Sequence, residues 1–131
     1  YGKFEKSEGF VFAGTAGEKE AQERSLLRIG ELNPGRAEAY NQMGIFYRHI
    51  GRFEDARKMY ERALNIDPGY QSARYNLGIL YDLYLVNIPM ALESYKKYLA
   101  MVPSEDKQVG LWIADLEKRH KSVQKVAESK P

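Results

Sequence analysis

The chain has 131 residues, of which 44% are hydrophobic and 29% are charged, and its formal net charge is +2. That length fits one domain with a modest core, and so small a charge gives no bulk attraction to nucleic acid or to an anionic membrane. The absence of cysteine excludes disulfides, thiol catalysis and cysteine metal sites. No apolar run is long enough to predict a membrane span.

Residues 1–17 contain four glycines and lack helical periodicity, so we expect an extended or disordered N-terminal arm. Within this arm, Phe10, Val11 and Phe12 form a short apolar run. Two outcomes are open for that run. It covers apolar surface of its own domain or of a neighbouring molecule, or it contacts nothing.

The first predicted helix covers 18–32, where charged residues surround one apolar face made of Ala21, Leu26, Ile29 and Leu32. This helix ends before Pro34. Pro68 and Pro103 follow later helices in the same way, and the three prolines are separated by 34 and 35 residues. Because proline disfavours helix in the residue before it, the prolines mark three equivalent helix ends.

Two helical hairpins are predicted between these ends. The first hairpin pairs 37–49 with 53–66 and turns at Gly51, which suits the left-handed residue that follows a helix. The second hairpin pairs 70–84 with 89–101. Its turn lacks glycine and contains one extra residue.

The two hairpins share a set of positions. In the first they are Tyr40, Met43, Gly44, Tyr47, Ala56, Tyr60, Ala63 and Pro68. In the second, Leu77, Gly78 and Tyr81 recur after 34 residues, and Ala91, Tyr95 and Pro103 recur after 35. A glycine inside a helix costs about 1 kcal/mol relative to alanine. We therefore expect each glycine to permit a close helix crossing, with the small alanine of the same hairpin (Ala56 or Ala91) opposite it.

The last predicted helix covers 104–127. Ser104 is its expected N-cap, and one apolar face is formed by Val109, Trp112, Ile113 and Leu116. Beyond Glu117 the sequence is polar on all sides, which is typical of a helix that closes a helical stack against water. We expect Trp112 to pack near Tyr98 at the end of the second hairpin.

The repeated set resembles the signature of the tetratricopeptide repeat. The resemblance implies an all-α fold, a right-handed superhelix of antiparallel helix pairs closed by a C-terminal capping helix. The implied organisation is an arm (1–17) and a repeat domain (18–131). That domain holds a half repeat (18–34), two repeats (37–68 and 71–103) and a capping helix (104–127).

The resemblance also implies a function. The chain is similar to many small bacterial proteins that use two to four such repeats as adaptors or assembly factors. We therefore expect a non-catalytic scaffold that binds a protein or peptide segment in the concave groove of its helices. Carried over by position, the groove residues are Glu38, Asn41, Ile45, Arg48, Ser72, Tyr75, Ile79, Asp82 and Lys107. Ile45 and Ile79 are expected to form an exposed apolar strip, and Arg48 and Asp82 to meet across the groove.

The alternative function is a structural module that associates with itself, and the expected state is a monomer or a weak homo-oligomer. A clamp for a peptide carboxylate is not predicted, because Asn41 and Ile45 occupy positions where clamp proteins carry lysine and asparagine. No catalytic constellation, cofactor or metal site is predicted, since His49 and His120 lack suitably spaced partners. Neither a nucleic-acid partner nor a membrane span is expected. The compartment favoured is the cytoplasm, or the periplasm if the chain is a mature fragment.

Overall fold

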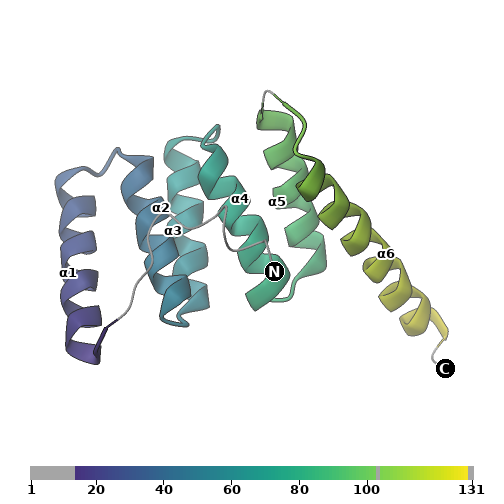
Figure 1. The fold of residues 1–131 in the computed structure, drawn as a ribbon, viewed down its shortest axis with the longest axis horizontal. Helices are drawn as coiled ribbons and strands as arrows, with labels where there is room; N and C mark the ends of the chain where they lie inside the picture. Colours follow the sequence, from purple (N-terminus) through teal and green to yellow (C-terminus); the bar gives the residue numbers. More distant parts are fainter. Residues whose placement is uncertain (1–13, 103, 130–131) are drawn as a thin grey trace.

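The computed structural model describes residues 14–102 and 104–129, so the first 13 residues of the predicted arm, with Phe10 to Phe12, lie outside the described residues. The described residues form a row of α-helices, which confirms the predicted all-α class (Figure 1). The helices are α1 (Ala16–Leu32), α2 (Ala37–His49), α3 (Phe53–Ile66), α4 (Gln71–Ile79), α5 (Ile88–Met101) and α6 (Lys107–Ser129). A π-helical turn, η1 (Leu80–Tyr84), continues α4.

The first hairpin, α2 and α3, begins and ends at the predicted residues. Gly51 has a φ of +82°, the left-handed conformation predicted for it. Its N–H donates to the carbonyl of Arg48 at 3.1 Å, and the N–H of Arg52 donates to the carbonyl of Tyr47 at 2.8 Å. These two bonds satisfy the last carbonyls of α2 and fix the direction in which α3 starts.

The second hairpin contains the extra residue at the end of its first helix. The N–H of Asn87 donates to the carbonyl of Tyr81 at 2.8 Å, so this closing bond spans one residue more than the bond from Arg52 to Tyr47. The wider π-helical turn η1 accommodates the insertion. Val86 then adopts a φ of +52°, in the place that Gly51 holds in the first hairpin.

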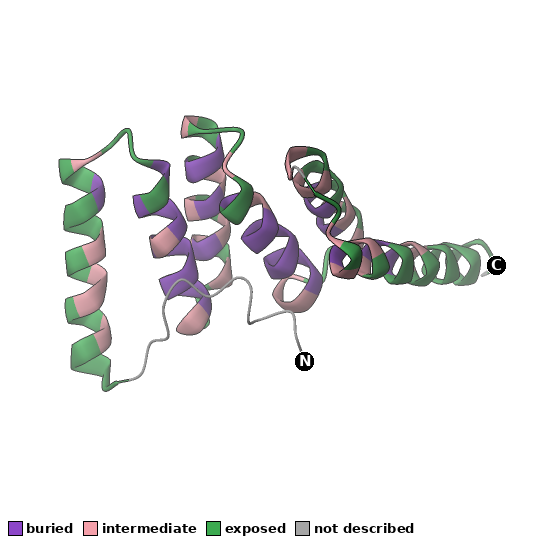
Figure 2. Cartoon of the chain, turned by 45° about the horizontal axis from the view of Figure 1, so that its top comes forward, coloured by how far each residue is buried: buried purple, intermediate pink, exposed green. Residues whose placement is uncertain are grey.

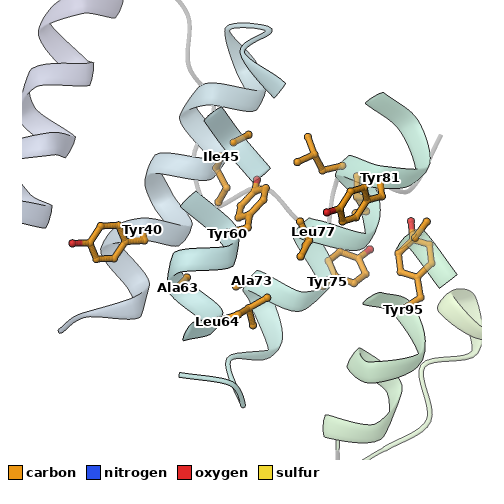
Figure 3. Packing of buried hydrophobic residues seen from close by; sticks show 14 of the residues in the cluster. Tyr40, Ile45, Tyr60, Ala63, Leu64, Ala73, Tyr75, Leu77, Tyr81 and Tyr95 are labelled. Atoms are coloured by element: carbon orange, nitrogen blue, oxygen red, sulfur yellow. The ribbon is translucent and has the colours of Figure 1, made fainter. Parts of the chain in front are cut away.

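Aromatic rings rest on both repeated glycines. The two rings, those of Tyr60 and Tyr95, belong to the buried cluster drawn in Figure 3. A Cβ added at Gly44 would collide with the ring of Tyr60, and one added at Gly78 would lie 2.5 Å from Cδ1 of Tyr95. The predicted close crossing is therefore present, and the expectation that an alanine also faces each glycine stays a prediction. The ring of the tyrosine one turn after each alanine lies against the glycine, in space that is open only because glycine has no side chain.

A polar network fastens α1 to the first hairpin. The Tyr47 hydroxyl donates to Oε2 of Glu23 at 2.8 Å. Arg52 donates to the same oxygen at 2.9 Å and to Asp55 at 2.8 Å, and its guanidinium stacks on the Tyr47 ring. The turn after α2 is thereby joined to the preceding helix.

The capping helix α6 begins later than predicted. Asp106, rather than Ser104, caps it, because Oδ1 of Asp106 accepts the N–H of Val109 at 3.2 Å. Val109, Ile113 and Leu116 are buried, whereas most residues beyond Glu117 are exposed and project away from the row (Figure 2).

Candidate functional site

The nine predicted groove residues come from α2, from α4 with η1, and from the start of α6. Glu38, Ser72 and Lys107 are exposed. The other six are buried, namely Asn41, Ile45, Arg48, Tyr75, Ile79 and Asp82. The expected exposed strip is wrong, because Ile45 is only 1% exposed and Ile79 is 0% exposed.

Polar groups are concentrated on the helices that carry these positions. Among the residues that the structure describes, five polar or charged residues are buried, and four of them belong to α2, α4 and η1: Asn41, Arg48, Asn76 and Asp82. The two amides are joined, since Nδ2 of Asn76 donates to Oδ1 of Asn41 at 3.0 Å. This bond links α4 directly to α2. Buried polar groups are costly unless they are paired, so their concentration on one set of helices calls for an explanation.

Two polar atoms in this region have no partner among the described residues. Asn76 is only 2% exposed, and its Oδ1 accepts no hydrogen bond. The neighbouring Tyr75 is 4% exposed, and its hydroxyl is likewise buried without a partner. Burial, together with the nearby Asp106 carboxylate, raises the pKa of Tyr75. The face therefore holds an unused acceptor and an unused neutral donor on adjacent residues.

The sequence-based groove set includes Tyr75 but omits Asn76. The signal that could have found Asn76 is the pair of asparagines, Asn41 and Asn76, which lie 35 residues apart, one more than the 34-residue spacing of the first helices. Position in the repeat points to Tyr75 as the equivalent of Asn41. The structure instead pairs Asn41 with the residue that follows Tyr75.

Asp82 is buried, which contradicts the exposure predicted for it. Its carboxylate accepts the Tyr95 hydroxyl at 3.0 Å and lies 3.5 Å from Arg119 of α6. The prediction treated Asp82 and Arg48 as exposed charges meeting across an open groove, but both residues are buried. These contacts of Asp82 hold the capping helix against the second hairpin.

Aromatic side chains close the α6 end of this face. The rings of Tyr75 and Tyr98 lie 5.0 Å apart, and the Tyr98 hydroxyl donates to Asp106 at 3.1 Å. Trp112 stacks near Tyr75 and Tyr95, at 6.1 and 5.8 Å between ring centroids. A cavity of about 570 Å³, lined in part by Tyr98 and Lys107, lies beside this cluster.

Two further classes of feature are absent from residues 14–102 and 104–129. None of the helices described there is long and apolar enough to cross a membrane. The same residues hold no group of three or more histidine, aspartate or glutamate side chains placed to bind a metal ion.

Paired helices of matching length, a glycine under each tyrosine and a capping helix together define a helical-repeat protein. A model of the tetratricopeptide repeat family matches residues 19–69 and 35–104. Because these matches cover more than half of the chain, the chain belongs to the tetratricopeptide repeat family. The predicted fold class, a superhelix of antiparallel helix pairs, is confirmed.

Two relatives illustrate the similarity. The uncharacterized protein ycf37 of Pyropia yezoensis is 30% identical over 92 residues, covering 61% of this chain and 52% of ycf37. The chloroplastic tetratricopeptide repeat domain-containing protein PYG7 of Arabidopsis thaliana is 29% identical over 68 residues, covering 52% of this chain and 22% of PYG7. The chain thus spans about half of one relative and under a quarter of the other.

Proposed function

We propose that this chain is a non-catalytic scaffold that binds a protein or peptide segment along the face built from α2, α4 and the start of α6. Membership of the tetratricopeptide repeat family supports protein interaction as its general role. The observation that supports this particular face is the unused pair of polar atoms, Oδ1 of Asn76 and the hydroxyl of Tyr75.

A peptide backbone offers one N–H donor and one carbonyl acceptor per residue. An N–H of the bound segment donates to Asn76, and a carbonyl accepts the hydroxyl of Tyr75. Leaving such groups unpaired in the free protein costs about 1–3 kcal/mol each, so a partner that satisfies them recovers this free energy on binding. The exposed charges of Glu38 and Lys107 at the two ends of the face favour a segment with complementary charges.

Binding requires movement of side chains on this face. Asn76 and Tyr75 are almost fully buried, so a partner reaches them only when neighbouring groups separate. Association is then slower than the docking of two preformed surfaces. The remaining groove positions act as the walls of the opened site.

The test uses peptides selected from a random library against the wild-type chain. Tyr75→Phe keeps the ring and removes only the unused hydroxyl. We expect this variant to bind the selected peptides about tenfold more weakly, the loss of one well-placed hydrogen bond. Its melting temperature should be equal or higher, because the free protein loses an unsatisfied buried group.

The matched control is Tyr84→Phe, a tyrosine whose ring packs on Phe53 at 4.7 Å, away from the proposed face. This variant should bind the peptides as the wild type does. Equal affinity of the wild type and both variants for every selected peptide, or selection of no peptide at all, would overturn the proposed site.

A further inference from the structure

Arg74 interrupts the set of positions that the two hairpins share. It stands 34 residues after Tyr40, as Gly78 stands after Gly44, so Arg74 and Tyr40 are equivalent. Tyr40 is only 5% exposed, and its ring points from α2 toward α1 (Figure 3). The Tyr40 hydroxyl donates to the carbonyl of Gly30 at 3.5 Å. The second hairpin therefore lacks the aromatic ring that fills the equivalent space in the first.

A cavity of about 460 Å³ lies at this place, between α3, α4 and α5. Leu64, Leu77 and Tyr81 are buried in its lining. Asn65 and Glu93 also line it and are exposed, so the cavity opens to solvent. Apolar walls with a few polar groups are typical of sites that bind a side chain or a small ligand. None of the nine predicted groove residues lines this cavity.

The guanidinium of Arg74 offers an unused donor here. Among the described residues, its Nε is buried without an acceptor. The two carboxylates that line the same cavity are bound to other cations, since Arg57 donates to Glu61 at 2.8 Å and Lys97 donates to Glu93 at 2.8 Å. The hydrogen bond and charge of Lys97, with a smaller effect of the charge of Arg74, lower the pKa of Glu93. A bound group must therefore supply an acceptor to Arg74 beside two ionised carboxylates.

We propose that this cavity binds a tyrosine side chain of a partner protein. A phenol is neutral, so Glu61 and Glu93 do not repel it as they would repel an acidic side chain. Its oxygen accepts the Nε–H of Arg74, its O–H donates to a neighbouring carboxylate, and its ring packs on the apolar walls. The first hairpin contains a related contact, because the guanidinium of Arg62 lies 4.5 Å from the centroid of the Tyr40 ring.

The probe is p-cresol, which reproduces the tyrosine side chain. It is titrated into the isotope-labelled wild-type chain while the amide chemical shifts are followed. We expect saturable changes centred on Leu64, Leu77 and Ser94, with a dissociation constant in the millimolar range, as suits so small a ligand. Toluene lacks the hydroxyl and should bind about fivefold more weakly, because Arg74 then stays without an acceptor. Propionate should leave these amides unchanged.

Three results would overturn the assignment of a tyrosine. They are equal affinity for toluene and p-cresol, tighter binding of propionate than of p-cresol, and unchanged amides at Leu64, Leu77 and Ser94 when p-cresol reaches its solubility limit. Tighter binding of propionate would instead indicate an acidic partner.

Two variants test the role of Arg74. Arg74→Met keeps a long side chain without the guanidinium and should weaken p-cresol binding about fivefold. Arg74→Tyr places the residue of the first hairpin in the second, fills the cavity from within and should abolish the shift changes. Its melting temperature shows whether it folds. The matched control is Arg24→Met, at an exposed position of α1, which should bind as the wild type does. Wild-type affinity in Arg74→Met would contradict the proposal.

This site is independent of the face proposed above. Tyr75 does not line the cavity, so Tyr75→Phe should bind p-cresol with wild-type affinity. Selection of library peptides, in turn, does not require the cavity beside Arg74. Failure of either site thus leaves the other standing.

Discussion

The ring of Tyr60 lies against the α-carbon of Gly44, in the space where any side chain at position 44 would begin. Tyr95 lies in the same way on Gly78 in the second hairpin. In each hairpin, a tyrosine ring of the second helix thus packs directly on a glycine of the first helix. The first prediction follows from this contact.

Gly44→Ala should destabilise the protein by about 1–3 kcal/mol, because the new methyl group forces the Tyr60 ring or the whole of α3 to move. The matched control is Gly110→Ala, another glycine inside a helix, where an added Cβ meets nothing within 4 Å. That variant should gain up to about 1 kcal/mol from helix propensity. Urea unfolding measures both. Changes of the same sign in the two variants would contradict this account of the crossing.

The second prediction concerns Val86, a β-branched residue with positive φ. Val86→Gly should stabilise the chain by about 1 kcal/mol, because glycine adopts this conformation without the steric cost that valine bears. The side chain is 73% exposed, so its removal loses little packing. Gly51→Val makes the reverse change at the equivalent turn and should destabilise. Thermal unfolding of the two variants should show shifts of opposite sign.

The third prediction concerns the contact between Arg119 and Asp82. Arg119→Ala removes a cation from a carboxylate that is 1% exposed, while Arg119 itself is half exposed. Water partly screens the pair, so we expect a modest loss of about 1 kcal/mol. Hydrogen exchange should also become faster in the second half of α6. Lys118→Ala, the neighbouring exposed residue, serves as the control, and an equal loss in that variant would remove any special role for Arg119.

The fourth prediction is a pH dependence at Tyr47. Burial, reinforced by the hydrogen bond to Glu23, raises the pKa of Tyr47 from 10.0 to about 12. The folded state therefore favours the neutral phenol. The stability that Tyr47 contributes is complete below its unfolded pKa of about 10, and is lost as pH rises through about 12.

Urea unfolding of the wild type and of Tyr47→Phe should reveal this contribution. Near neutral pH the variant should be less stable by about 1 kcal/mol, since it lacks the bond to Glu23. The difference between the two proteins should shrink, and then change sign, as pH rises from about 10 to about 12. Other titrating groups act on both proteins alike and cancel in the comparison. A difference that stays constant across this range would contradict the raised pKa.

The positions of the helices can be predicted from the sequence because the strongest signals for them are local. Prolines end the helices, Gly51 ends α2, and apolar spacing marks the faces, so α2 and α3 lie at their predicted residues. The start of α6 depends on which of several possible N-cap residues is used. The structure uses Asp106 and not Ser104. The added residue of the second hairpin was detectable as a spacing of 35. Its form, the π-helical turn followed by Val86, depends on tertiary packing.

The candidate site is less predictable than the fold. The position of a residue within a repeat tells which face of the helix it lies on, but not whether its side chain is exposed to solvent. Ile45 and Ile79 lie on the predicted helices, but their burial is decided by contacts between distant parts of the chain. Glu38, which belongs to the same predicted groove set, is exposed. The pairing of Asn76 with Asn41 likewise depends on how α4 packs against α2.

Ile113 stands ten residues after Pro103, as Gly44 stands after Pro34 and Gly78 after Pro68. A tyrosine ring cannot rest on an isoleucine as it does on a glycine, so α6 lacks the bare surface on which the tyrosines of the two hairpins lie. The buried side chain of Ile113 fills this place. Designers who wish to lengthen the array beyond α6 must first restore a glycine there. If extra units were added without that change, the side chain of Ile113 and the tyrosine ring of the added hairpin would occupy the same space on α6.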